Sequence, residues 1–352
     1  MFVLAWIYGC IVNLRNWLFD MDILHSQSYD HPIIGVGNLT VGGTGKTPHT
    51  ELLVGIMLEE GLSVATLSRG YKRKTHGFRI ASEVSTATEI GDEPLQMALR
   101  FPEITVAVDE NRCHGIDCLL KERKPDVIVL DDAYQHRYVK PGLNILLIDY
   151  NRPAHSDRLL PAGRLREPFE GRNRADIVIV TKCPRKMTPI DFRVFEHDMR
   201  LMPFQKLFFS TLHYGDLVPL FADEPLLPLK NLRQKDNILL LTGIANPDQL
   251  HQDLMPYCQR ISLLTFPDHH SFTKRDAERI NETFRLLPAD EKIIITTAKD
   301  AVRLRLIADK LSDAVRTALF ILPIKVEFLR DEERTFQRIV MEYVRKTKSK
   351  LL

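Results

Sequence analysis

The stretch from Gly37 to Pro48, which reads Gly-Asn-Leu-Thr-Val-Gly-Gly-Thr-Gly-Lys-Thr-Pro, limits the possible folds of this chain more than any other. The apolar run at 32–36 predicts a buried strand before it. Apolar residues at helical spacing between 52 and 57 predict a helix after it, which ends at Gly61. A glycine-rich turn between a strand and a helix points backbone N–H groups and the positive end of the helix dipole at a phosphate. The stretch therefore predicts a nucleoside triphosphate site.

The match to the pattern G-x-x-x-x-G-K-[ST] is incomplete, because Thr40 occupies the first glycine position. We expect Lys46 to reach the outer phosphates and the Thr47 hydroxyl to bind Mg²⁺. The alternative is a strand-to-helix turn with a surface lysine, but three glycines in four positions favour the nucleotide site. The predicted nucleotide-binding residues are Thr40, Val41, Gly42, Gly43, Thr44, Gly45, Lys46 and Thr47.

Length and charge restrict the remaining possibilities. A chain of 352 residues exceeds one comfortable core, so we expect two domains. The net charge of +2 argues against nucleic acid as the main partner. Five scattered cysteines without a C-x-x-C pair argue for a reducing compartment and against a cysteine zinc site. The expected division is an apolar N-terminal helix at 1–20, a P-loop core at 21–218, a linker at 219–236 and a C-terminal α/β domain at 237–352.

The N-terminus is unusually apolar, since Met1 to Val12 carries no charge. The apolar stretch is too short and too interrupted to predict a membrane span, which needs about 20 apolar residues. The basic region and cleavage site of a signal peptide are missing. Two interpretations stay open: a buried helix, or an interfacial helix with Trp6 and Trp17 at the depth of the lipid headgroups.

Apolar runs alternate with helical stretches along the rest of the chain. This pattern predicts an α/β fold: a P-loop NTPase-like, mostly parallel sheet with helices on both faces, and a second, smaller α/β domain. Ligands of such sheets bind at the carboxyl ends of the strands. The polar residues that follow the predicted strands should therefore share one site: the P-loop, 69–74, 109–112, Asp131, Asp132, Asp149, Thr181 and Lys182. Predicted strands lie at 63–68, 104–108, 127–130, 144–148, 177–181, 207–212, 238–243, 261–266, 292–297 and 319–322, and predicted helices at 274–287 and 333–346.

Two acidic pairs are candidates for chemistry. Asp131 and Asp132 directly follow an apolar strand, where an acidic residue of a P-loop protein holds Mg²⁺; a plain polar strand end is the alternative. Asp92 precedes Glu93 and Pro94, and it either caps a helix from Pro94 onward or takes a proton from an acceptor hydroxyl. From the residues alone we expect the cap.

Two polar loops add candidates. Arg164 and Arg166 could neutralise charge on a transferring phosphoryl group, and Glu167 could help to hold the metal. His269 and His270 follow Asp268, which is consistent with solvated side chains or with a catalytic histidine supported by an aspartate.

The segment after the predicted strand at 177–181 indicates which base the nucleotide carries. Thr181 and Pro184 stand where the N-K-x-D guanine reader has its Asn and Asp, so we expect adenine rather than guanine.

Taken together, these blocks resemble the tetraacyldisaccharide 4'-kinases of lipid A biosynthesis. The resemblance covers nearly the whole chain, from Trp6 to about Leu304. The family wording Asp-Asp-Gly-Leu-Gln-His reads Asp-Asp-Ala-Tyr-Gln-His here, and Arg164 stands where the family often has proline. The matching blocks are 37–48, 68–73, 91–94, 131–136, 160–168, 243–247 and 268–270.

The resemblance implies a kinase that moves the γ-phosphate of ATP to the 4'-hydroxyl of an acylated glucosamine disaccharide 1-phosphate. It places the family's catalytic aspartate on Asp92, which reverses the preference for a cap, and the partner histidine on His269. It implies that the metal-side carboxylates are Asp131, Asp132 and Glu167, and that Arg166 is the phosphate-stabilising arginine. The apolar N-terminus would bring the enzyme to a lipid acceptor at the cytoplasmic face of the bacterial inner membrane. Lys72, Arg73, Lys74 and Arg112 would meet the 1-phosphate or anionic lipid, although a solvated basic loop is equally consistent.

A rival hypothesis is a membrane-associated, dimerising P-loop ATPase switch. Such proteins share the Gly-Gly-x-Gly-Lys-Thr loop, but their signature lysine precedes the two glycines, and Val41 occupies that position here. The dependence of ATP turnover on a lipid disaccharide acceptor would distinguish the two.

Overall fold

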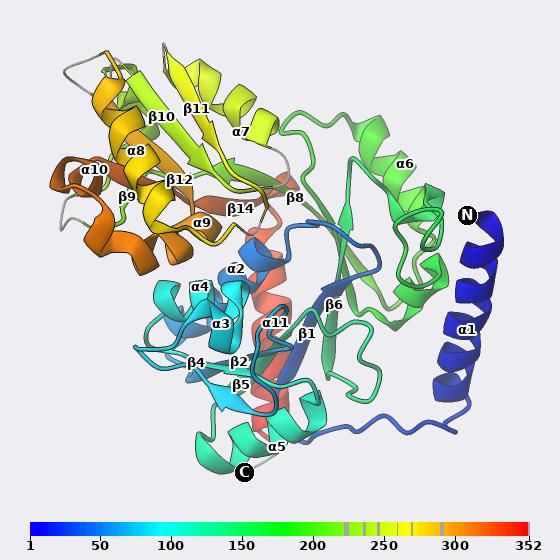
Figure 1. Ribbon diagram of the computed structural model, residues 1–352. Coiled ribbons are helices and arrows are strands. Elements are labelled where there is room, and N and C mark those ends of the chain that lie inside the picture. Colours follow the sequence, from blue (N-terminus) through cyan, green and yellow to red (C-terminus); the bar gives the residue numbers. More distant parts are fainter. Residues whose placement is uncertain are drawn as a thin grey trace. The chain divides into compact units, whose positions relative to one another are not determined.

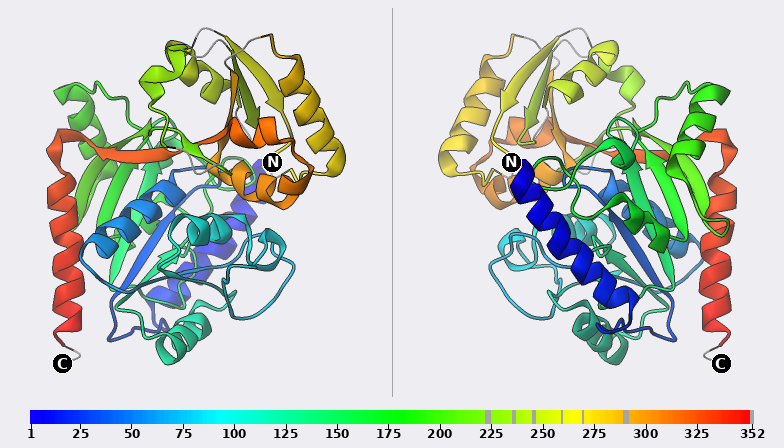
Figure 2. Two further views of the ribbon diagram at one scale, coloured as in Figure 1. Left: turned by 90° about the vertical axis from the view of Figure 1, so that its left-hand side faces the viewer. Right: turned by 90° about the vertical axis from the view of Figure 1, so that its right-hand side faces the viewer.

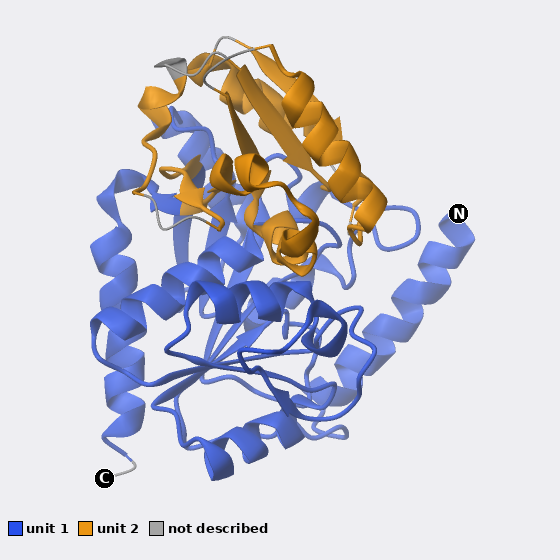
Figure 3. Cartoon of the chain, turned by 60° about the vertical axis from the view of Figure 1, so that its left-hand side comes forward, with its two compact units in different colours: residues 1–212, 326–352 blue, residues 213–325 orange. Residues whose placement is uncertain are grey.

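The computed structural model describes residues 1–221, 225–234, 237–244, 247–258, 260–268, 270–288 and 292–350. The chain forms two compact units (Figure 3). Unit 1 comprises residues 1–212 and 326–352, and unit 2 comprises residues 213–325.

This division differs from the expected one at both ends of unit 2. The expected linker at 219–236 contributes Leu229 and Leu232 to the core of unit 2, and β9 (Val218–Pro219) pairs with β13 (Leu319–Leu322). The chain then returns to unit 1 at its C-terminal end, through β14 (Ile324–Phe328) and α11 (Glu333–Lys348). Phe336 and Val340 of α11 are buried in the main core of unit 1. An amphipathic pattern shows that a helix covers a sheet, but it does not show which sheet.

Unit 1 is built on a nine-stranded sheet with the order β14-β8-β7-β6-β1-β5-β2-β4-β3 (Figure 1). The strands from β8 to β4 run parallel, and β3 is antiparallel to β4. The remaining bounds are β1 (Ile33–Asn38), β2 (Val64–Ser68), β3 (Arg79–Ile80), β4 (Thr105–Val108), β5 (Val127–Asp131), β6 (Leu143–Asp149), β7 (Ile177–Thr181) and β8 (Lys206–Tyr214).

Helices cover both faces of this sheet, as a parallel sheet requires. Ile34 of β1 packs in one cluster with Leu53 of α2 and Val340 of α11, whereas the neighbouring Ile33 packs on the opposite face with Ile116 of α5. The apolar strands are therefore buried on both sides, which explains why they read as continuous apolar runs. The helices of unit 1 besides α11 are α1 (Phe2–Asp20), α2 (Lys46–Glu59), α3 (Ala87–Ile90), α4 (Asp92–Arg100), α5 (Arg112–Glu122) and α6 (Pro189–Met199).

The N-terminal helix α1 lies at the surface of unit 1 (Figure 2). One end is anchored, because Phe19 is buried with its ring centroid 5.1 Å from that of Tyr138, and Arg137 donates to the Asn16 carbonyl at 2.9 Å. Gly9 and Phe19 are the buried residues of α1, so the interpretation as a buried core helix is wrong. By length and composition α1 could cross a membrane, with a mean hydropathy of 1.3. Its exposed apolar residues are Phe2, Val3, Leu4, Trp6, Ile7, Ile11, Leu14 and Trp17.

Unit 2 has a five-stranded sheet with the order β11-β10-β12-β13-β9, in which the first four strands are parallel. Leu239 and Leu241 face α8, while Ile238 and Leu240 face α7. The bounds are β10 (Asn237–Thr242), α7 (Pro247–Leu254), β11 (Ile261–Thr265), α8 (Lys274–Leu286), β12 (Lys292–Thr297), α9 (Ala298–Leu304) and α10 (Asp313–Thr317).

Candidate active site

The predicted phosphate loop connects β1 to α2, and its backbone has the glycine-dependent shape that a phosphate cradle needs. Gly42 and Gly45 have φ angles of +110° and +84°, which disfavour any residue with a Cβ. A Cβ added at Gly42 or Gly43 would meet no described atom within 4 Å, so this side of the loop is open. Across the loop, the Asn38 side chain donates to Thr44 Oγ1 at 2.8 Å.

The first half of the loop pairs with residues 164–166. The Val41 N–H donates to the Arg164 carbonyl at 2.8 Å, and the Arg166 N–H donates to the Leu39 carbonyl at 2.7 Å. The backbone N–H of Val41 is thus already used by the protein, while Thr40 is held in the same bridge. This pairing fixes Arg166 directly beside the phosphate loop.

Asp132 lies between the two predicted phosphate-binding cations. Its carboxylate is 3.5 Å from Lys46 Nζ and 3.2 Å from Arg166 Nη1. Burial alone would raise the pKa of Asp132, but Lys46 and Arg166 outweigh it and hold the pKa below the usual range. Asp132 is therefore ionised and keeps both cations at the loop.

Asp131, at the end of β5, lies next to Val36 of β1 in the sheet and is buried. It accepts a hydrogen bond from Thr50 Oγ1 of α2 at 3.3 Å. Burial, followed by the charges of Glu93 and Asp132, raises its pKa to about 7. Asp131 is thus an acidic group with a deficit of positive charge around it.

Glu167, one of the expected metal carboxylates, is held by two neighbouring side chains. One carboxylate oxygen accepts from Gln135 at 3.0 Å and the other from Arg174 at 2.7 Å, and the residue is buried. Within the described part of the chain, no group of three His, Cys, Asp or Glu residues is arranged to hold a metal. Each oxygen accepts one hydrogen bond and keeps a further lone pair, so the metal role of Glu167 stays a prediction.

Asp92 is the first residue of α4, which corrects the capping hypothesis. The helix begins at Asp92 rather than at Pro94, and Gly91, with φ +95°, is the N-cap residue. A Cβ at Gly91 would lie 3.1 Å from the Tyr71 carbonyl, so the backbone there is closely packed. Asp92 is half-buried in the first turn of α4, held by Leu95 and Met97 in the core behind it.

The histidine block falls in unit 2. His269, to which the resemblance assigns the partner role, lies outside the described residues. His270 has partners within unit 2: its Nε2 is 3.0 Å from an Asp276 carboxylate oxygen of α8. Its ring stacks on that of Phe266, with 4.9 Å between the ring centroids. Asp268 forms an ion pair with Lys299 at 3.3 Å.

Basic residues next to the carboxylates come from two loops. Arg112, at the start of α5, is buried, and burial lowers its pKa to about 10. The charge of Arg69 lowers this pKa further, whereas the carboxylates of Asp132 and Asp131 oppose the shift. Arg73 is not part of a solvated basic loop, because it pairs with Glu110 at 2.7 Å with its side chain 2% exposed. Lys72 and Lys74 are exposed.

Comparisons with known proteins show which family the chain belongs to. The family model for tetraacyldisaccharide-1-P 4'-kinase matches residues 1–345. The chain belongs to this family. A tetraacyldisaccharide 4'-kinase of Phocaeicola vulgatus is 51% identical over 98% of this chain and 95% of its own length. One of Bacteroides thetaiotaomicron is 49% identical over 98% of this chain and 93% of its own.

A solved structure of a tetraacyldisaccharide 4'-kinase is also similar. The crystal structure of LpxK from Aquifex aeolicus in complex with ATP has a TM-score of 0.75 at 29% sequence identity, and it covers 97% of this chain and 98% of that one. The predicted α/β P-loop kinase fold is therefore confirmed, and so is the resemblance read from the sequence blocks.

Sequence reasoning missed two residues that lie at this candidate site. The Gln135 amide N–H₂ donates to the Asn38 carbonyl at 2.7 Å and to Glu167, and its amide oxygen accepts from Arg166. Arg174 donates to the other carboxylate oxygen of Glu167. Gln135 follows Asp131 and Asp132 within one block, which is a usable signal. Arg174 lies in a short 3₁₀ helix (Phe169–Arg174), and nothing in its spacing marks it.

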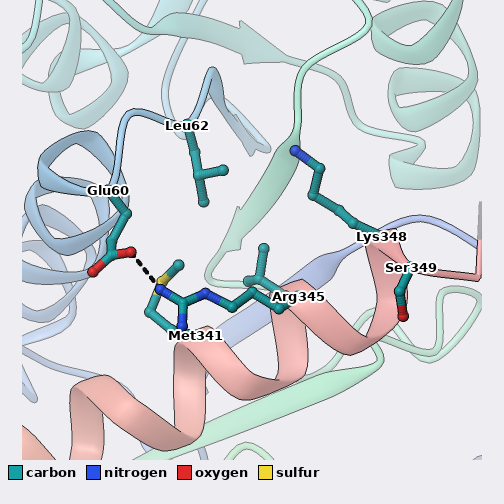
Figure 4. Close-up of a pocket in the computed structure, with 7 residues that line it drawn as sticks. Glu60, Leu62, Met341, Arg345, Lys348 and Ser349 are labelled. Carbon is teal, nitrogen blue, oxygen red and sulfur yellow. Dashed lines mark hydrogen bonds and ion pairs between the residues drawn. The ribbon is translucent and has the colours of Figure 1, made fainter. Parts of the chain in front are cut away.

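One hollow of about 270 Å³ lies elsewhere on unit 1, between the end of α2 and α11 (Figure 4). It is lined by Leu62, Met341 and Val344, and Glu60 and Arg345 form an ion pair of 2.6 Å at its edge. The 14-residue helix α2 spans about 20 Å between this hollow and the phosphate loop, so the hollow takes no part in the chemistry.

Proposed function

We propose that this chain transfers the γ-phosphoryl group of ATP to the 4'-hydroxyl of a tetraacylated glucosamine disaccharide 1-phosphate. The observation that carries the proposal is the family match over residues 1–345 on a chain whose phosphate loop, Asp92, Asp131 and Asp132 are all intact. The LpxK structure in complex with ATP supports ATP as the phosphate donor.

In the proposed step, the acceptor O4' attacks the γ-phosphorus, the bond from that phosphorus to the bridging oxygen breaks, and ADP leaves. Asp92 takes the hydroxyl proton as general base. Lys46 and Arg166 supply positive charge to the transferring group, because both already lie beside the loop and against Asp132. The role of His269 as partner of the base rests on the resemblance alone and stays a prediction.

The hydroxyl and carboxylate oxygens present at the site fit the ligand preference of Mg²⁺. Asp131 lacks a full counter-charge, and Mg²⁺ in such sites is held by one or two carboxylates together with substrate phosphates. We assign Thr47, Asp131, Asp132 and Glu167 as the groups that would hold it, and Glu167 also anchors Arg174 and Gln135. The ion would neutralise charge on the phosphates of ATP.

The acceptor side is assigned to the basic residues near Asp132. Buried Arg112 and the neighbouring Arg69 place two guanidinium groups where an anionic group of the acceptor gains from them. We propose that they meet the 1-phosphate. We do not assign this role to Arg73, because its guanidinium group is already paired with Glu110.

We further propose that α1 brings the enzyme to the membrane that contains its acceptor. Its apolar residues are exposed over most of the helix, and its polar contacts to unit 1, such as Tyr8 Oη to the Arg166 carbonyl at 2.7 Å, leave that face uncovered. Since the donor is ATP, the cytoplasmic face of the bacterial inner membrane is the proposed location.

The test is ATP consumption with and without tetraacyldisaccharide 1-phosphate in detergent micelles, with mass spectrometry of the lipid. The proposal predicts that ADP forms only with the acceptor and that the lipid gains one phosphate. Lys46→Ala should abolish both, whereas Lys121→Ala, an exposed lysine of α5, should not. ADP release without acceptor, with ATP-dependent dimer formation, would instead support an ATPase switch.

A further inference from the structure

Three consecutive carbonyl groups of the phosphate loop accept hydrogen bonds from side chains outside the loop. Lys182 Nζ donates to the Gly43 carbonyl. Thr181 Oγ1 donates to the Thr44 carbonyl at 2.8 Å. His49 Nδ1 lies 2.7 Å from the Gly45 carbonyl, and since a carbonyl oxygen only accepts, the His49 nitrogen carries the proton.

Holding a carbonyl fixes the direction of the next N–H group. The peptide unit is planar and trans, so its C=O and N–H point in opposite directions. With the Thr44 and Gly45 carbonyls turned toward Thr181 and His49, the N–H groups of Gly45 and Lys46 must point away from these side chains. Those are the N–H groups at the start of α2, where a phosphate binds.

The three holding side chains are themselves fixed. Thr181 is fully buried at the end of β7, and His49 is buried with its Nε2 2.9 Å from Ser210 Oγ of β8. Lys182 is restrained by an ion pair of 2.7 Å with Asp149 of β6. The loop is thus attached to three neighbouring strands of the unit 1 sheet.

We propose that His49, Thr181 and Lys182 are positioning residues that hold the phosphate loop in its binding shape before ATP arrives. The inference rests on the proposed function only in taking ATP as the loop's ligand. Thr181 and His49 act through the N–H groups of Gly45 and Lys46, so their effect falls on the phosphates of ATP and not on the lipid acceptor. Lys182 holds the Gly43 peptide, whose Thr44 N–H donates to the Gly42 carbonyl at 3.1 Å, and so fixes the turn before them. Preorganised donors need no rearrangement at the moment of reaction, so kcat depends on them as well as binding.

Thr181 provides the sharpest test, because two near-isosteric changes separate the hydroxyl from the side-chain volume. Thr181→Val removes the donor, and Thr181→Ser keeps it. We expect Thr181→Val to weaken ATP binding in calorimetry about tenfold, as the loss of one buried hydrogen bond implies, and to lower kcat, with the acceptor KM unchanged. Thr181→Ser should restore both values.

The matched control is Thr66→Val, which removes a buried threonine hydroxyl from β2 in the same sheet. It should lower the melting temperature without changing the ATP dissociation constant. If Thr181→Val behaves like Thr66→Val, with lower stability and unchanged ATP affinity, the inference is overturned.

His49 gives an independent arm. His49→Asn can place its amide N–H near the position of Nδ1, whereas His49→Leu cannot donate. Weaker ATP binding in His49→Leu with recovery in His49→Asn supports the inference, and equal ATP affinity in the two variants overturns it. Calorimetry needs no acceptor, so failure of the wild type to phosphorylate the lipid would refute the proposed function and leave this test intact.

Discussion

Asp131 and Asp132 are adjacent in sequence, yet the structure gives them opposite electrostatic surroundings. Asp132 faces Lys46 and Arg166, so its pKa is lowered in spite of burial. Asp131 is buried near Glu93 and Asp132, and its pKa is raised to about 7. One carboxylate thus has cationic partners within the protein, whereas the other is buried beside like charges.

Asp92 is the residue on which the proposed proton transfer depends. Asp92→Asn keeps the size of the side chain but removes the basic carboxylate. We expect kcat to fall by about 10² to 10⁴-fold with KM for ATP nearly unchanged, as for the loss of a general base. Steady-state kinetics of lipid phosphorylation measures this.

The matched control is Glu103→Gln, an exposed carboxylate shortly after the end of α4. It should keep a kcat near that of the wild type. Normal turnover of Asp92→Asn together with a lower melting temperature would show that the role of Asp92 is structural.

His136 makes stability depend on pH. Burial, followed by the charges of Arg112 and Arg15, lowers its pKa to about 4. An unfolded histidine titrates near 6.5, so between about pH 4 and 6.5 the unfolded chain binds more protons, and stability falls as the pH falls. As the pH falls from about 6.5 to 4, the unfolding free energy of the wild type should decrease. That of His136→Gln should decrease by roughly 1–3 kcal/mol less.

Urea unfolding at a series of pH values measures this difference. His25→Gln, whose side chain is 83% exposed in the wild type, serves as the control and should follow the wild-type curve. Identical pH dependence of His136→Gln and the wild type would contradict the account.

Among the elements, α1 contacts unit 1 along one side and exposes apolar side chains over the rest of its surface. Replacement of Trp6 and Trp17 by glutamine removes two large exposed aromatic side chains, 71% and 51% exposed. We expect weaker sedimentation with phospholipid vesicles and slower turnover on vesicle-embedded acceptor, with unchanged ATP affinity.

Val84→Gln, an apolar residue 85% exposed outside α1, is the control for this pair and should sediment like the wild type. If the double tryptophan variant binds vesicles as well as the wild type does, α1 does not attach the protein to membranes.

The start of α9 in unit 2 depends on one buried carboxylate. Asp300 accepts from the Gly243 N–H at 2.9 Å and from Thr297 Oγ1 at 2.7 Å, so it ties β10 to the cap of α9. Asp300→Ala leaves these buried donors without an acceptor and should destabilise unit 2 by about 2–4 kcal/mol in chemical unfolding. Asp313→Ala, at a side chain 99% exposed, should change little, and equal effects of the two would refute this reading.

At the scale of the whole molecule, long apolar runs predicted the central strands well. The predictions for β5, β7, β10, β12 and β13 lie within about a residue of the observed bounds, because both faces of these strands are buried. The two-residue strands β3 and β9 are too short to leave a pattern. β14 was missed because Lys325 and Glu327 interrupt its apolar residues.

The site was predictable where its residues directly follow strands. Asp132, which directly follows β5, meets Lys46 of the phosphate loop as expected. Arg166 joins them from a polar loop that pairs with the phosphate loop. His49 and Arg174 were not predictable, because the partner of His49 is a backbone carbonyl and the partner of Arg174 is a distant carboxylate, and no spacing reveals either.

The central claim is that this chain phosphorylates a lipid at one particular oxygen. The most direct measurement incubates the protein with γ-labelled ATP and either tetraacyldisaccharide 1-phosphate or its 4'-deoxy analogue, and then locates the label by NMR and mass spectrometry. The account predicts one labelled phosphate on O4' for each ADP formed, and no transfer to the 4'-deoxy lipid. Label at another oxygen, or ADP without labelled lipid, would contradict it.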